Sequence, residues 1–373
     1  MAAKRAGSPA AIDKIEYTKS ALLRAGADVQ LVSACGAKAG EGRLPRVAHA
    51  IGPRERHIYL SAGRFPTKFG SAAARVVAWW NVIRYLLTEV RSGEAVLVYH
   101  APSLIGPLSL VRRFKRFHLV LEVNEIYSTV WSSFANLRMA EERFVRSADA
   151  YLFVSSIAAR KFSGGKFYAI SHGTYFLPPQ ASRRDGGEVV HAVYAGVVDS
   201  RRGAELAAKS AAFLPENFVI DILGFGTDEA IAALDAEIRR VNSTIGRQCV
   251  RFHGQKRGRE LTDFLHSCDV GLSTHQYRGE ELEGSQYCFP SKVSLYVTHG
   301  LPVVSERLQV LVDSKLARAA TFYEQATPNL VADAIVKGAL EGSRLEMREL
   351  VTELDKAFVE ELAVVVKHGV TAV

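Results

Sequence analysis

Short apolar segments alternate with stretches of helical pattern over most of this 373-residue chain. An apolar run followed by a helix is typical of a parallel strand that is buried on both faces of its sheet. The alternation therefore predicts an α/β protein with parallel sheets. The predicted strands are residues 28–33, 95–99, 119–123, 150–154, 166–170, 189–194, 218–223, 250–253, 269–273 and 303–304.

The chain is long enough for two ordinary domains. Residues 176–188 are rich in proline, glycine and arginine, which is the composition of a loop or linker. We therefore predict an N-terminal domain over residues 1–180 and a C-terminal domain over residues 181–373. In doubly wound domains of this kind, ligands bind at the carboxyl ends of the strands.

The two halves differ in charge. Residues 1–180 contain 25 Lys and Arg against 12 Asp and Glu, whereas residues 181–373 contain 22 against 27. A basic half and an acidic half suit two domains with different partners, and simple drift in surface composition is the alternative.

Composition also limits the class of protein. The four cysteines show no C-x-x-C spacing, so neither a zinc site nor a redox dithiol is expected, and a reducing cytoplasm is the predicted compartment. The longest uncharged run, residues 95–111, contains two prolines and is too short to span a bilayer. We expect a soluble protein that at most attaches to a membrane surface.

Residues 287–304 read as a short helix followed by a strand. Pro290 suits the first helical turn, where its missing N–H costs nothing. Ser291 and Lys292 would then lie at a helix N-terminus, where free N–H groups and the helix dipole favour an anion. The segment therefore predicts a diphosphate site that needs no metal, and an ordinary capped helix is the alternative.

Glycine turns follow two other strands of the second half. Gly196 precedes Arg202, which can pair with a phosphate, although a plain turn is equally compatible with this sequence. Gly224 and Gly226 suggest a dinucleotide fingerprint that is not completed. We expect a glycine turn beside a nucleotide pocket here rather than a nicotinamide site.

Polar residues follow two strands of the first half. Glu122 and Glu125 emerge at the end of the strand 119–123, where they suit a general base or the binding of sugar hydroxyls. His100 ends the strand before it and could orient a substrate or act as a base. Capping carboxylates and a histidine that satisfies a local hydrogen bond are the alternatives.

Residues 112–118 mix arginine and lysine with phenylalanine, and Trp79 and Trp80 lie on a predicted helix over residues 72–90. Together they could contact an anionic membrane surface. Nucleic acid is the other interpretation, but no nucleic-acid-binding signature supports it. If these residues bind no partner, residues 112–118 are a solvated helix end and residues 72–90 form a buried helix that carries the two tryptophans.

Taken together, these motifs resemble the GT-B glycosyltransferases, especially the family 4-like enzymes of bacterial polysaccharide assembly. The most specific match is residues 289–304, FPSKVSLYVTHGLPVV, which is similar to the family block P-x-K-x-x-E-Y-x-x-x-G-x-P-V-V. The resemblance implies two Rossmann-like doubly wound parallel-sheet domains that face each other across a cleft. It also implies transfer of a hexose from a nucleoside-diphosphate sugar to a hydroxyl of a saccharide or lipid-linked acceptor, with no metal or other cofactor and no nucleic acid.

The resemblance assigns roles to individual residues. It implies that the second domain binds the donor and that the first domain binds the acceptor, with Glu122 and Glu125 as catalytic candidates. His100 is a third catalytic candidate because of its position at a strand end. The candidate donor-binding residues are Gly196, Arg202, Gly224, Gly254, Ser291, Lys292 and Ser294.

The sequence departs from the family pattern at several places. Gln286 and Ser294 stand where the family often has two glutamates, and Glu281 and Glu283 are candidates to replace one of them. The strand that normally opens the first domain is expected to be missing or cut off. A degenerate, non-catalytic sugar-nucleotide-binding partner and a nucleotide-sugar epimerase are the alternative functions. The predicted location is the cytoplasm, with attachment to the inner face of the plasma membrane as a further option.

Overall fold

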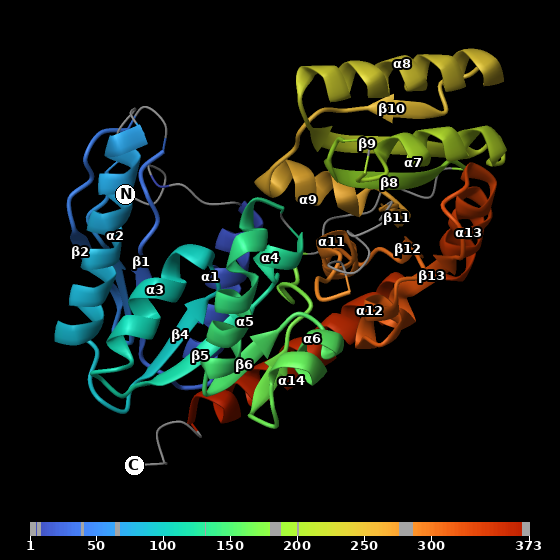
Figure 1. The fold of residues 1–373 in the computed structure, drawn as a ribbon. Coiled ribbons are helices and arrows are strands. Elements are labelled where there is room, and N and C mark those ends of the chain that lie inside the picture. Colours follow the sequence, from blue (N-terminus) through green and yellow to red (C-terminus); the bar gives the residue numbers. More distant parts are fainter. Residues whose placement is uncertain are drawn as a thin grey trace. The chain divides into compact units, whose positions relative to one another are not determined.

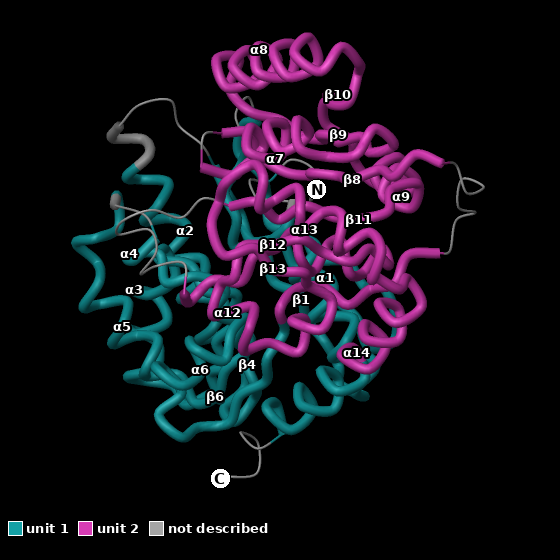
Figure 2. Tube along the Cα trace, turned by 90° about the vertical axis from the view of Figure 1, so that its right-hand side faces the viewer, with its two compact units in different colours: residues 1–171, 356–373 teal, residues 172–355 magenta. Residues whose placement is uncertain are grey.

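The computed structural model describes residues 5, 9–38, 41–63, 68–130, 132–179, 188–199, 201–275 and 286–367. The chain divides into two compact units, which Figure 2 shows in different colours. Unit 1 comprises residues 1–171 and 356–373, and unit 2 comprises residues 172–355.

These units differ from the domains expected from the sequence. Unit 2 begins at His172 rather than at residue 181, and the chain from Lys356 onward belongs to unit 1. The physical reason is packing: the ring of Phe358 stacks on Tyr17 with centroids 5.5 Å apart. A contact between the two ends of the chain leaves no local signal in the sequence.

Unit 1 contains two sheets (Figure 1). One is fully parallel, and its strands follow chain order: β4 (Ala95–Tyr99), β5 (His118–Val123), β6 (Ala150–Phe153) and β7 (Tyr168–Ile170). The other has the order β1–β3–β2, with β3 parallel to β1 and antiparallel to β2. Its strands are β1 (Val29–Ser33), β2 (Val47–Gly52) and β3 (Glu55–Tyr59).

The helices of unit 1 connect these strands. Of the four parallel strands, β5 and β6 are almost completely buried. The helices are α1 (Pro9–Arg24), α2 (Lys68–Thr88), α3 (Pro102–Val111), α4 (Tyr127–Val130), α5 (Arg138–Ser147) and α6 (Ser156–Phe162), with a 3-10 helix at Ser132–Leu137. Helix α14 (Arg344–Lys367) contributes its C-terminal part to this unit.

Unit 2 is built on one six-stranded parallel sheet of order β10–β9–β8–β11–β12–β13. Numbered within the unit this is 3-2-1-4-5-6, the strand order of the Rossmann fold. The chain order reverses between β8 and β11, and ligands of such sheets bind at that switch point. The strands are β8 (Val190–Val197), β9 (Phe218–Phe225), β10 (Val250–Phe252), β11 (Val270–Ser273), β12 (Val303–Glu306) and β13 (Ala320–Tyr323).

Helices α7, α8 and α13 cover one face of this sheet and share a buried apolar core with it. Helix α11 packs against β11 and β12, where a Cβ on Gly271 would lie 2.2 Å from the ring of Tyr296. The helices of unit 2 are α7 (Ala204–Ser210), α8 (Asp228–Ile245), α9 (Gly258–His266), α11 (Ser291–Thr298), α12 (Gln309–Val312), α13 (Pro328–Glu341) and the start of α14, with 3-10 helices at Ala211–Phe213 and Lys315–Ala319.

Every strand predicted from the sequence is present, and β2, β3 and β13 were not predicted. Among the residues that the structure describes, no helix has the length and hydropathy needed to cross a bilayer.

Candidate functional site

The loops that follow β8 and β11 meet at the switch point of the unit 2 sheet. Gly203 has φ 84°, and a Cβ there would lie 1.5 Å from the carbonyl oxygen of Thr274. The Thr274 hydroxyl donates to the Gly203 carbonyl oxygen at 2.8 Å. Only glycine fits both this backbone conformation and this contact, so the sequence Arg202-Gly203 fixes the two loops against each other.

The loop after β8 is ordered by its own polar groups. The Tyr194 hydroxyl lies 2.7 Å from the Val197 carbonyl oxygen and 3.0 Å from that of Arg202. Asp199 Oδ1 accepts hydrogen bonds from the backbone N–H groups of Arg201 and Arg202 at 2.9 and 2.8 Å. Arg202 is thereby held at the switch point, with its half-exposed guanidinium 3.7 Å from Asp199 Oδ2.

Lys292 lies in the first turn of α11, and its side chain is 6% exposed. Its Nζ sits 4.8 Å from the ring centroid of Tyr194 and 3.4 Å from His275 Nε2. A Cβ on Gly196 would lie 2.7 Å from Lys292 Cε, so the missing side chain at the end of β8 makes room for the lysine. The two residues that the sequence predicted separately are in contact.

The ammonium of Lys292 is electrostatically uncompensated. Among the described residues, no carboxylate lies within ion-pair distance of its Nζ. Burial, and then the nearby guanidinium of Arg202, lowers the pKa of Lys292 to about 7, against a smaller opposing effect of Asp199. Burial and the charges of Lys292 and Arg202 also hold the pKa of His275 well below its usual range. Binding of an anion nearby would strongly stabilise the charged form of a buried ammonium such as that of Lys292.

The start of α11 leaves backbone N–H groups available. Pro290 is the N-cap, one residue before the helix rather than in its first turn, and no side chain caps the helix. Ser291 is exposed. Uncapped N–H groups and the positive end of the helix dipole add to the charge of Lys292 at this place.

Ser294, another predicted donor-binding residue, has a different environment. Its side chain is 5% exposed, and its hydroxyl donates to the His172 carbonyl oxygen at 2.8 Å. A Cβ on Gly173 would lie 2.5 Å from Ser294 Cβ. Ser294 therefore anchors the segment that opens unit 2. Gln286 is half-buried, whereas Glu281 and Glu283 lie outside the described residues.

The remaining predicted glycines lie beside the switch point. A Cβ on Gly224 would come within 2.2 Å of the Gly196 carbonyl oxygen, so the ends of β8 and β9 approach closely. The Gly224 N–H donates to the Gly254 carbonyl oxygen at 2.9 Å, which joins β9 to the turn after β10. Gly196, Gly224 and Gly254 all lie at the carboxyl ends of their strands, as predicted.

In unit 1, Glu122 is 2% exposed and belongs to a buried polar cluster. Its Oε1 lies 3.4 Å from the Thr18 hydroxyl. Burial raises the pKa of Glu122, and the charge of Lys14 opposes this shift. Lys14 is also 6% exposed and donates to the Ser171 carbonyl oxygen at 2.8 Å. The cluster joins α1 to the ends of β5 and β7.

His100 and Glu141 form a second buried cluster, and each is 1% exposed. His100 Nε2 lies 2.7 Å from Glu141 Oε1. The same carboxylate accepts hydrogen bonds from the backbone N–H groups of Tyr127 and Ser128 at 2.9 and 2.8 Å. Although burial opposes it, these bonds lower the pKa of Glu141. The pair fixes the start of α4, directly after the predicted acidic motif.

Glu125 differs from both buried acids because it is half-exposed, in the turn between β5 and α4. Of the three catalytic candidates in unit 1, it is the one whose side chain a substrate can reach without disrupting the core. His275 and Glu141 were not among the residues predicted from the sequence. His275 follows a strand end and could have been found by that rule, whereas nothing in the sequence connects Glu141 to His100.

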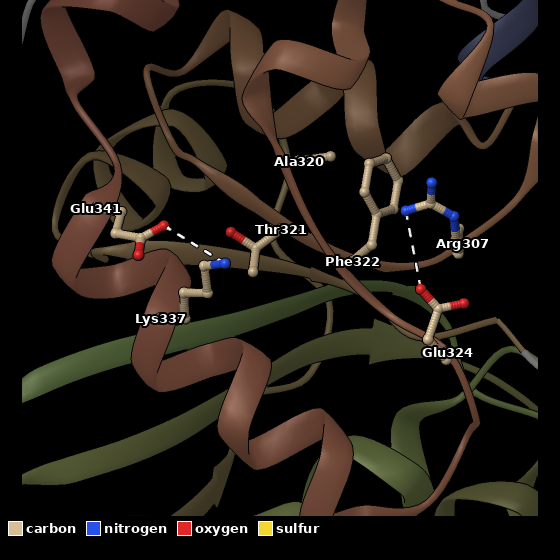
Figure 3. Close-up of a pocket in the computed structure, with 7 residues that line it drawn as sticks. All are labelled: Arg307, Ala320, Thr321, Phe322, Glu324, Lys337 and Glu341. Atoms are coloured by element: carbon tan, nitrogen blue, oxygen red, sulfur yellow. Dashed lines mark ion pairs between the residues drawn. The ribbon is translucent and has the colours of Figure 1, made fainter.

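A cavity of about 270 Å³ lies elsewhere in unit 2, between the edge strand β13 and helix α13 (Figure 3). Its charged side chains compensate one another in pairs. Arg307 Nη1 is 3.8 Å from Glu324 Oε1, and Lys337 Nζ is 3.9 Å from Glu341 Oε2. With no excess charge, this cavity does not select an anion, and none of the predicted site residues lines it.

No protein-family model matches the sequence, and no curated protein matches it. Solved structures do match. A sucrose-phosphate synthase from Thermosynechococcus elongatus is 16% identical with a TM-score of 0.60, over 94% of this chain and 88% of that one. An α,α-trehalose-phosphate synthase (UDP-forming) from Burkholderia xenovorans, in complex with glucose-6-phosphate, is 11% identical with a TM-score of 0.63, over 97% and 95%.

A third match is the trehalose-6-phosphate structure from E. coli bound with UDP-2-fluoro glucose, which is 11% identical with a TM-score of 0.61, over 99% and 98% of the two chains. Identities this low establish the fold and not the reaction. The chain has the GT-B fold of two Rossmann-like domains, as the sequence motifs predicted.

Proposed function

We propose that this protein is a glycosyltransferase that moves a sugar from a nucleoside-diphosphate sugar to a hydroxyl group of a saccharide or lipid-linked acceptor. Cell-surface polysaccharide synthesis by a family 4-like enzyme is the proposed setting. The fold supports the proposal because structures that share it include a UDP-forming synthase and a protein bound with UDP-2-fluoro glucose.

The observation that carries the proposal is the buried, uncompensated ammonium of Lys292 at the Rossmann switch point. An enzyme that releases a nucleoside diphosphate must stabilise the negative charge that develops on the leaving group. Lys292, the guanidinium of Arg202 and the uncapped start of α11 can stabilise that charge without a metal ion. Because these groups are already in place, little reorganisation is needed during the reaction.

In unit 1, we propose that Glu125 accepts the proton of the acceptor hydroxyl. Glu122 and His100 are assigned to supporting roles because their side chains are buried in clusters of their own. The acceptor is proposed to be carried by a lipid, with the protein in the cytoplasm and attached to the inner face of the plasma membrane.

The first experiment measures donor binding. Thermal unfolding is followed in the presence of a panel of nucleotide sugars, because a ligand that binds the folded form raises its apparent stability by about 2.7 kcal/mol at a concentration 100 times its Kd. The wild-type protein should respond to at least one donor, and the Lys292→Ala variant should not. Lys315→Ala, at an exposed lysine of the same unit, is the control and should respond like the wild type.

The second experiment measures transfer to an acceptor. Glu125→Gln should lower kcat by about 10²- to 10⁴-fold while donor binding is retained, since only the base is lost. Donor binding without transfer to any acceptor would assign a non-catalytic role. Conversion of the donor without an acceptor would assign an epimerase. Full turnover in both Glu125→Gln and Glu122→Gln would show that the acidic motif is structural.

A further inference from the structure

Helices α2 and α3 of unit 1 leave large apolar side chains in solvent. Trp80 is 62% exposed, Val76 68%, Leu87 44%, Leu110 43% and Phe114 79%. On α2 the positions 76, 80, 84 and 87 follow helical spacing, so their side chains lie on one face. With their neighbouring arginines, these five residues define the α2–α3 surface.

The two helices present one continuous surface because they are in contact. A Cβ on Gly106 of α3 would lie 2.5 Å from the ring of Trp79 on α2, so the glycine allows close packing. Lys115, directly after Phe114, donates to the Leu87 carbonyl oxygen at 2.8 Å. The exposed apolar residues of the two segments therefore lie on neighbouring elements of unit 1.

The α2–α3 surface is also strongly basic. Neither residues 68–88 nor residues 102–118 contain an aspartate or glutamate. Four exposed arginines make no ion pair with any residue that the structure describes: Arg75, Arg84, Arg113 and Arg116. Arg112 is different, because its guanidinium binds both oxygens of Asp149 at 2.8 Å.

We propose that the α2–α3 surface binds an anionic lipid bilayer. Exposed aromatic and aliphatic side chains can enter the interface between headgroups and acyl chains, while the arginines bind the anionic headgroups. A nucleic acid fits this surface less well, because Val76, Leu87 and Leu110 have neither a positive charge to bind a phosphate nor an aromatic ring on which a base could stack. A two-fold contact with a second copy would place the same arginines against each other.

The surface is tested by sedimentation of the protein with vesicles. The wild type should bind phosphatidylglycerol–phosphatidylcholine vesicles and not vesicles of phosphatidylcholine alone. Binding should weaken as salt is raised from about 0.15 M to about 1 M, since the Debye length falls from about 8 to about 3 Å. No donor or acceptor is present, so this result is independent of the proposed transferase activity.

Two variants separate charge from apolar contact. The double variant Arg113→Gln/Arg116→Gln should weaken vesicle binding about 25-fold, because each arginine is expected to contribute about five-fold to the affinity. Phe114→Ser should weaken it about ten-fold. The matched controls are Arg239→Gln, at an exposed arginine of α8, and Leu340→Ser, where the leucine is also 79% exposed; both should bind like the wild type.

Several results would overturn the proposal. These are failure to bind either vesicle, equal binding by the wild type and the Phe114→Ser variant, and dimerisation that Phe114→Ser abolishes in sedimentation equilibrium. Binding to a duplex oligonucleotide that depends on Arg113 and Arg116 but not on Phe114 would assign the surface to nucleic acid instead. Circular dichroism melting confirms that each variant is folded before it is compared.

Discussion

Among the residues that the structure describes, each unit buries one lysine to the same extent, and the two lysines have different surroundings. Lys14 in unit 1 and Lys292 in unit 2 are both 6% exposed. Lys14 donates to the Ser171 carbonyl oxygen and lies near the carboxylate of Glu122, and burial lowers its pKa to about 8. Lys292 has no carboxylate within ion-pair distance among the described residues, and burial lowers its pKa to about 7.

The two lysines differ in how far the surrounding protein offsets their desolvation. The negative charge of Glu122 offsets part of the desolvation of Lys14 within the fold. An uncompensated buried ammonium destabilises the protein until an anion binds to it. The site in unit 2 therefore carries a cost in stability that binding of an anion would offset, whereas part of the cost in unit 1 is already offset by Glu122.

The largest expected effect is on catalysis. Lys292→Met keeps the volume of the side chain and removes its charge, so kcat/KM should fall by about 10²- to 10³-fold, as for the loss of one group that stabilises a transition state. Steady-state kinetics with the best donor measure it. Without donor, the same variant should unfold at a higher temperature than the wild type near pH 6, because the desolvated charge is gone. A lower unfolding temperature would contradict the comparison.

Lys14→Met should have the opposite effect on stability. The variant leaves the Glu122 carboxylate buried without its cation, which should lower the free energy of unfolding by about 3 kcal/mol. Urea unfolding of both proteins at neutral pH measures the difference. The double variant Lys14→Met/Glu122→Gln should recover part of the loss, since no buried charge remains. Equal stability of single and double variants would show that the two groups do not interact.

Donor affinity should depend on pH through Lys292. Its pKa is about 7 without ligand, and a diphosphate beside it raises that pKa toward the ordinary value. Affinity should therefore be constant below about pH 7, apart from titration of the donor itself. Above pH 7 it should fall by up to about ten-fold per pH unit, because the complex must take up a proton. Calorimetry in two buffers of different ionisation enthalpy measures that uptake, and no uptake at pH 8 would contradict the assignment.

The smallest effect concerns the space beside β8. Gly196→Ala places a Cβ 2.7 Å from Lys292 Cε, so the lysine must shift away from the Tyr194 ring. Donor affinity should fall by about ten-fold, measured by calorimetry. Gly36→Ala is the matched control, because a Cβ there meets no atom within 4 Å. If both variants bind donor like the wild type, the close contact at Gly196 has no functional role.

The strands and the switch-point site were predictable because their signals are local. The alternation of apolar runs predicted ten strands, all of which are present, and Gly196 at a strand end and Lys292 at a helix start were each predicted as a ligand contact. The hairpin of β2 and β3 was missed because neither strand is a continuous apolar run: His49 interrupts β2, most of which is exposed, and β3 begins with three polar residues. β13 was missed because Ala320–Tyr323 is short and partly polar.

Burial and long-range partners were not predictable. The sequence left Glu122 and Glu125 as equal candidates, and only the structure separates a carboxylate in the core from one that is half-exposed. The contact of Glu141 with His100 spans 41 positions, and that of Tyr17 with Phe358 joins the two ends of the chain. Such contacts depend on the complete fold, and no short sequence pattern encodes them.

The contact between Gly173 and Ser294 restricts how this protein can change. A side chain at position 173 would collide with the serine, and a longer residue at position 294 would have to displace the main chain that its hydroxyl now holds. A larger residue at one of the two positions therefore requires a smaller residue at the other. A mutational library that varies each of them alone should recover almost exclusively small residues at both.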